Sequence, residues 1–139
     1  MVVLVLFMMF IPASMPLRKR ANEASALNTM HSIYRAEQSY ASLHPEVGFT
    51  CSLKDLLAPS VGDRALAVDM FSEVKSGYYF SLSSCSSAAI GGKPRITSYK
   101  VTAVPVALGK SGNKGFCAGE AGKLSFDPDG GNHCTKQVD

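Results

Sequence analysis

An apolar run at the start of the chain sets the strongest limit on how it can fold. Val2 to Ile11 includes no polar or charged side chain, whereas the sequence after Pro12 has the mixed composition of a water-soluble domain. As an α-helix, Met1 to Ile11 measures about 16 Å, roughly half of what a bilayer core requires. The run cannot cross a membrane unaided, so another apolar surface must cover it.

Three explanations of this run remain open. It is a signal peptide cleaved near Ala13 to Met15, although no positive charge precedes it and the basic cluster Arg18 to Arg20 follows it. Alternatively, it is the second half of a membrane anchor, or a hydrophobic helix buried among copies of itself.

A long helical pattern follows the run. Pro12 and Pro16 are expected to kink or melt a helix, which divides the chain into residues 1–16 and a globular domain, 17–139. From Arg18 to Leu43 good helix formers dominate, and neither glycine nor proline occurs before Pro45. Apolar residues recur there at steps of three, four or seven, which predicts one amphipathic helix. The expected stripe is Leu17, Ala21, Ala24, Leu27, Met30, Tyr34 and Ala41.

The rest of the chain predicts a small antiparallel sheet, so the expected fold class is α+β, a long N-terminal helix packed on that sheet. Alternation and aromatic content indicate strands, while serine, glycine and proline indicate loops. The expected elements are short helices at 51–57 and 64–75, a strand at 78–82, a loop at 83–94, a strand at 98–107, a turn at 109–115 and a hairpin at 116–126.

Four widely spaced cysteines follow the apolar run, and no two of them have C-x-x-C spacing. Such a pattern is typical of disulfides formed in an oxidising compartment. Three pairings are possible, and we favour Cys51 with Cys85 and Cys117 with Cys134, because each closes a short loop. Four free buried thiols in a cytosolic protein are the alternative.

The sequence shows no catalytic constellation. His31, His44 and His133 are scattered, and no acid or nucleophile has a spacing that ties it to any of them. Gly109 to Ser111 matches the tail of a phosphate-binding loop, but position 104 is valine where that loop requires glycine. The net charge of +3 includes one dense basic cluster, so no specific nucleic acid is expected as a partner.

Four segments of the chain carry family-like patterns: the helix has ANEASALN (21–28) and IYRAEQSY (33–40), and the expected strands have SGYYF (76–80) and YKVTAVP (99–105). Together these segments resemble bacterial type IV pilins and type II secretion pseudopilins. The resemblance covers nearly the whole chain. The basic leader of that family, and the glutamate five residues into its mature chain, are not found. If Pro12 matches the family's proline, about ten mature residues precede Met1: the start is mis-assigned, the anchor is encoded separately, or the subunit dispenses with it.

The resemblance implies a structural subunit of a helical filament, a pilus or pseudopilus, and not an enzyme. Expected partners are copies of the chain, a short separate N-terminal pilin chain and an inner-membrane assembly machinery. The expected location is an extracellular filament or the periplasm, with anchoring in the inner membrane before assembly. The residues expected to drive filament assembly are Val2, Val3, Leu4, Val5, Leu6, Phe7, Phe10, Ile11 and Pro12.

Two further interpretations stay open. Related pseudopilins carry calcium near the C-terminus, and Asp127 and Asp129 lie in a segment whose oxygen-bearing side chains suit calcium. Pro-Asp-Gly is also an ordinary turn signal, and we expect no cofactor to be required. The alternative function is a secreted, monomeric, disulfide-bonded binding domain whose signal peptide is cleaved.

Overall fold

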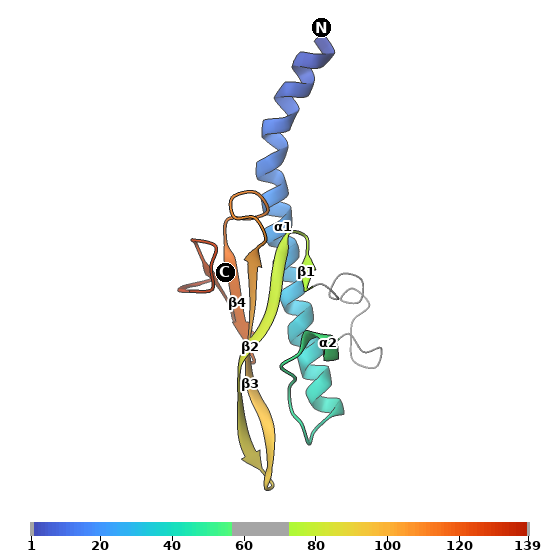
Figure 1. Cartoon of the computed structure of the whole chain (residues 1–139), viewed down its shortest axis with the longest axis vertical. Helices are drawn as coiled ribbons and strands as arrows, with labels where there is room; N and C mark the ends of the chain where they lie inside the picture. The colour runs from blue at the N-terminus through green and yellow to red at the C-terminus, as the bar shows by residue number, and fades with distance from the viewer. Residues whose placement is uncertain (1, 57–72, 139) are drawn as a thin grey trace.

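The computed structural model describes residues 2–56 and 73–138, and it shows the expected α+β fold. A long helix packs on a six-stranded antiparallel sheet in which each strand pairs with the next along the chain (Figure 1). The elements are α1 (Val2–Leu43), α2 (Leu53–Leu56), β1 (Val74–Lys75), β2 (Tyr78–Ile90), β3 (Lys93–Pro105), β4 (Gly115–Gly119), β5 (Leu124–Asp127) and β6 (Lys136–Gln137).

The helix α1 is longer than the sheet that it covers. Its C-terminal part lies against the strands, and its N-terminal part projects beyond them (Figure 1). The backbone is helical through Pro12 and Pro16, so the prediction that a proline melts the helix is wrong. A turn begins immediately before Pro45, where the His44 N–H donates to the Tyr40 carbonyl at 2.9 Å. Proline therefore marks the end of α1 and leaves its middle intact.

The core face of α1 differs from the predicted apolar stripe. Ala26, Met30, Ile33 and Ala36 are buried against the sheet. Of the predicted stripe, Met30 is buried and Leu27, Tyr34 and Ala41 are half-buried, but Leu17, Ala21 and Ala24 are exposed. The same helical spacing describes more than one face of α1, so it does not say which face is buried. The sheet also covers only the later turns of α1. The first three stripe positions consequently lie outside the core.

Residues from three strands complete the core. Tyr78 and Phe80 from β2, Tyr99, Val101 and Ala103 from β3, and Phe116 and Ala118 from β4 are the members that the sheet contributes. The Tyr78 hydroxyl donates to the Lys114 carbonyl at 2.8 Å, so its buried polar end is satisfied. A Cβ atom at Gly112 would collide with the Tyr78 ring, which explains why glycine stands at this close approach.

Strands β2 and β3 continue beyond the sheet as a two-stranded arm, where a loop at 83–94 was predicted. Pairing runs on to Ile90 and Lys93, with register shifts near Ser86. Gly91 and Gly92 turn the chain at the tip with φ of 62° and 80°. Serine-rich sequence indicates a loop because it offers little to pack. Here the backbone hydrogen bonds between the two strands hold it extended, and the Cys51–Cys85 bridge anchors its base.

The remaining predictions have mixed outcomes. The hairpin at 116–126 is confirmed as β4 and β5, and the first short helix is confirmed as α2. The predicted helix at 64–75 is wrong at Glu73, which lies in a turn, and at Val74 and Lys75, which form β1; residues 64–72 lie outside the described ranges. The short edge strand β6, which pairs with Ser125 and Phe126, was not predicted.

Both predicted disulfides are present. Cys51 bonds to Cys85 and Cys117 bonds to Cys134, and no cysteine is free. The first bridge joins the segment before α2 to the base of the arm. The second joins β4 to the segment between β5 and β6. Two bridges of this kind indicate an oxidising, extracytoplasmic environment.

We expect replacement of Cys117 and Cys134 by alanine to lower the free energy of unfolding by about 3 kcal/mol, because the bridge closes a loop with a sequence separation of 17. Urea denaturation followed by circular dichroism measures this loss. A reductant should then change the variant only through the remaining bridge, Cys51–Cys85. Equal stability of variant and wild type would contradict the prediction.

Candidate assembly surface

The side chains considered as metal ligands are not brought together by the fold. In residues 2–56 and 73–138, no three histidine, cysteine, aspartate or glutamate side chains are placed to hold a metal ion. Asp127 accepts hydrogen bonds from the backbone N–H groups of Asp129 at 2.9 Å and His133 at 3.1 Å. The carboxylate of Asp127 therefore organises the turn, and the calcium hypothesis gains no set of ligands.

The segment that resembled a phosphate loop is a tight turn. The Gly109 N–H donates to the Gly112 carbonyl at 2.9 Å. The Ser111 hydroxyl accepts from the Ala107 N–H at 3.0 Å and donates to the Ala107 carbonyl at 3.2 Å. These bonds use the Gly109 N–H and the Ser111 hydroxyl, which are donors of the kind that a phosphate loop would present to its ligand.

The projecting part of α1 contains the residues predicted to drive assembly. Val2 to Pro16 has a length of about 22 Å as a helix. The structure describes the backbone of this segment, and the side chains of Val2 to Pro16 lie outside the described part. Among the described residues, none of the helices combines the length and the apolar content that a membrane crossing requires.

An exposed stripe on α1 continues from this projecting segment. Leu17 is 63% exposed, and the stripe changes from apolar to polar along the helix. Its first members after Leu17 are alanines, and its later members are polar or charged. The exposed stripe is Leu17, Ala21, Ala24, Asn28, His31, Arg35, Ser39 and Ser42. The apolar character of the projecting segment thus fades over the first turns that pack on the sheet.

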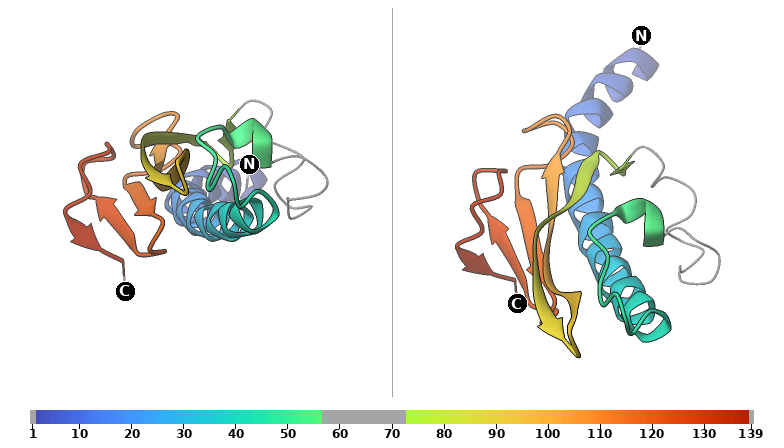
Figure 2. Two further views of the ribbon diagram at one scale, coloured as in Figure 1. Left: turned by 90° about the horizontal axis from the view of Figure 1, so that it is seen from below. Right: turned by 60° about the horizontal axis from the view of Figure 1, so that its bottom comes forward.

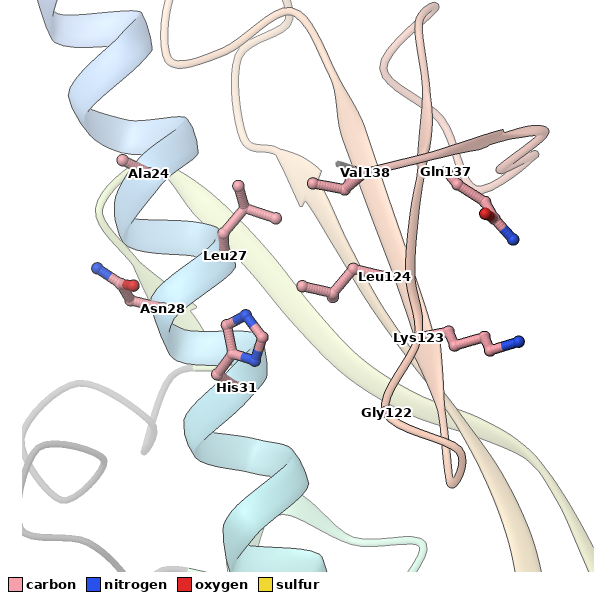
Figure 3. Close-up of a pocket in the computed structure, with 9 residues that line it drawn as sticks. All are labelled: Ala24, Leu27, Asn28, His31, Gly122, Lys123, Leu124, Gln137 and Val138. Atoms are coloured by element: carbon pink, nitrogen blue, oxygen red, sulfur yellow. The ribbon is translucent and has the colours of Figure 1, made fainter.

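A groove of about 620 Å³ lies between α1 and the last two strands (Figure 3). Leu124 and Val138 point across the gap toward α1, and Leu27 points into it from the helix, while Lys123 and Gln137 extend away from the helix. The groove is lined by Ala24, Leu27, Asn28, His31, Gly122, Lys123, Leu124, Gln137 and Val138. Its wall on the helix includes three members of the exposed stripe, Ala24, Asn28 and His31, together with the apolar Leu27, so stripe and groove form one surface.

Hydrogen bonds fix α1 relative to this surface. The Asn22 amide donates to the Ser111 carbonyl at 2.9 Å, and the Glu23 carboxylate accepts from the Asn113 N–H at 3.1 Å. At the other end of the groove, Gly122 lies so close to the Tyr34 ring that an added Cβ atom would be 3.1 Å from it. The helix is held at both ends of the groove, so the walls of the groove are preformed.

A buried carboxylate on the core face was missed by the sequence reasoning. Glu37 is 0% exposed, and its Oε1 accepts a hydrogen bond from the Thr50 N–H at 2.9 Å. Its Oε2 has no hydrogen-bond partner among the described residues. The available signal was its spacing of four from Ile33, which places Glu37 on the buried face of α1.

Burial raises the pKa of Glu37 from 4.5 to about 7. The hydrogen bond from Thr50 opposes this rise, and the nearby negative charge of Asp55 adds to it. Asp55 is held there because the Thr50 hydroxyl donates to its Oδ2 at 2.7 Å. Glu37 thus links α1 to the segment around α2, and its preferred state up to neutral pH is the protonated one.

No protein-family model, curated protein or solved structure matches the chain. The likeness to pilins therefore depends on topology and on the four segments of sequence. A long N-terminal helix, an antiparallel sheet and two disulfides follow one another in the pilin-like order.

We expect Glu37→Gln to reduce the pH dependence of stability. In wild type, the folded state holds a proton that the unfolded state releases above pH 4.5, so stability falls as the pH rises toward about 7 and then levels off. The total loss is at most about 3 kcal/mol. Urea unfolding at several pH values should show a variant more stable than wild type at pH 8 and similar to it at pH 4.

Glu46→Gln is the matched control, because Glu46 is exposed on the turn after α1. It should leave the pH profile of wild type unchanged. If the stability of Glu37→Gln falls with rising pH as steeply as that of wild type, the carboxylate of Glu37 does not titrate between a pKa of 4.5 and a pKa of about 7.

Proposed function

We propose that the chain is a structural subunit of a helical filament, a pilus or pseudopilus, and that it has no enzymatic activity of its own. The observation that carries the proposal is the projection of an apolar helical segment beyond the sheet of its own chain (Figure 2). Burial of apolar surface contributes about 25 cal/mol per Å², so an uncovered helix of this composition favours association.

The partner that suits the projecting segment is a second copy of the same helix. The exposed stripe provides a place where this contact can continue, because Ala21 and Ala24 are small and allow two helices to approach closely. The apolar side chains of the groove, among them Leu124 and Val138, extend the same surface toward the sheet. Each subunit would then cover its neighbour's helix and expose its own sheet.

The surroundings of the subunit follow from the same features. The two disulfides support assembly outside the cytoplasm, in an extracellular or periplasmic filament. Before assembly, the apolar end would be held in the inner membrane by the assembly machinery, and a separate short N-terminal chain would extend the anchor. Adhesion, motility, DNA uptake and secretion all use such a filament.

We expect Val5→Asp or Phe7→Asp to abolish filament formation, because a carboxylate in the filament core must be desolvated without a partner. The globular domain should remain folded, since its core begins at Ala26. Electron microscopy and sedimentation of the purified full chain measure assembly, and circular dichroism confirms folding. Ala88→Asp on the exposed arm is the matched control, and it should assemble normally.

Filaments of undiminished length from Val5→Asp would contradict the proposal. Mass spectrometry of the native N-terminus addresses the alternative. A mature chain without its first 14 or so residues, monomeric in buffer, would be the secreted binding domain instead.

A further inference from the structure

Exposed apolar side chains gather at two opposite ends of the domain. In the described residues, seven large hydrophobic side chains are exposed, and five of them lie on segments at these ends. Figure 1 shows the loop between β3 and β4 beside α1 where the helix leaves the sheet, and the turn after α1 at the far end. The exposed fractions are Leu17 63%, Val106 45% and Leu108 63% at the first end, and Leu43 55% and Val47 38% at the second.

We name these surfaces by their place on α1. The proximal end comprises Leu17 to Arg20 and Val106 to Lys110, which are held together by the hydrogen bond from Asn22 to Ser111. The distal turn comprises Leu43 to Val47. The helix between Leu17 and Leu43 is about 39 Å long, so a single chain cannot bring the two surfaces together.

The two surfaces carry opposite charge. Arg18, Arg20 and Lys110 are exposed at the proximal end. Glu46 is exposed on the distal turn, and the sequence from Gln38 to Leu53 contains no lysine or arginine. The proximal end is therefore apolar and basic, and the distal turn is apolar with one carboxylate that the basic end attracts.

We infer that the distal turn of one copy docks on the proximal end of the next, with Leu43 and Val47 packed against Leu17 and Leu108 and with Glu46 facing the basic residues. The inference rests on the proposed function, and it names the contact that sets the order of subunits. The Ile96 N–H donates to the Val47 carbonyl at 2.9 Å, so the neighbouring Arg95 borders the distal turn, and Glu46 alone makes the proposed charge contact with the basic residues.

This contact joins two different surfaces, so it repeats without closing and generates a fibre. It also places the neighbouring copy beside the projecting segment of α1, which leaves the domain at the same proximal end (Figure 1). The projecting segment would gain cover from the copy that docks there. Contact between the domains and contact between the helices would therefore form together.

Charge reversal tests the inference in the full-length chain. One variant is Glu46→Lys, the second is Arg18→Glu with Lys110→Glu, and the third combines all three changes. The measured quantity is the critical concentration for filament assembly, obtained by sedimentation. We expect it to rise about tenfold in each of the first two variants and to return to within about twofold of wild type in the third.

Glu120→Lys is the matched control, because it makes the same change at an exposed glutamate on the turn between β4 and β5. It should leave the critical concentration unchanged. Unfolding curves that match wild type would confirm that no variant acts by disturbing the fold.

Three outcomes separate the possibilities. If the combined variant assembles as poorly as the single-surface variants, or if these assemble like wild type, the docking contact is wrong although the filament stands. If a different protein binds either surface, or if two copies form a closed dimer, the combined variant would likewise fail to recover the critical concentration of wild type. If wild type itself stays monomeric at every concentration, the proposed function fails first.

Discussion

The mismatch in length between α1 and the sheet governs this structure. Packing on the sheet buries one face of the helix from Ala26 to Glu37, and that contact holds the domain together. Among the described residues, no strand lies beside the segment of α1 that projects from the proximal end (Figure 1). A helix in water needs tertiary cover for its apolar side chains, because propensity alone leaves a segment of this length marginal. In the proposed filament, another copy of the chain would supply this cover.

The segment between α1 and α2 connects the other elements to one another. Glu37 accepts from Thr50, and Cys51 next to it bonds to Cys85 at the base of the arm. The Phe49 N–H donates to the Ile96 carbonyl at 3.0 Å, which adds β3 to the same junction. The arm beyond this junction is exposed on all sides, and two-stranded ribbons are marginally stable alone. Its anchoring by a disulfide and by backbone pairing explains how it stays extended.

Features that depend on neighbours in sequence were predictable. The long helix, the hairpin of β4 and β5 and both disulfides follow from local patterns or short loops. The position of the core face on α1 could not be predicted, because it depends on where the sheet lies. The exposed Ala21 and Ala24 fit the helical period as well as the buried Met30 does. The arm was missed because its serines make no core contacts, and cross-strand pairing leaves no periodic signal in a sequence that is exposed on both faces.

The sequence predicted only the apolar segment of the candidate assembly surface, and its role in assembly stays a prediction. The run from Val2 to Ile11 is visible in any composition profile, whereas Leu17, Leu108 and Leu43 are isolated apolar residues that a sequence assigns to a core. Folding brings Leu17 and Leu108 to one end and leaves Leu43 at the other. The domain has two different exposed apolar surfaces and a projecting helix, and a closed symmetric dimer would not bury both the surfaces and the helix. The proposed open-ended filament would satisfy both at once, with the same two contacts at every subunit.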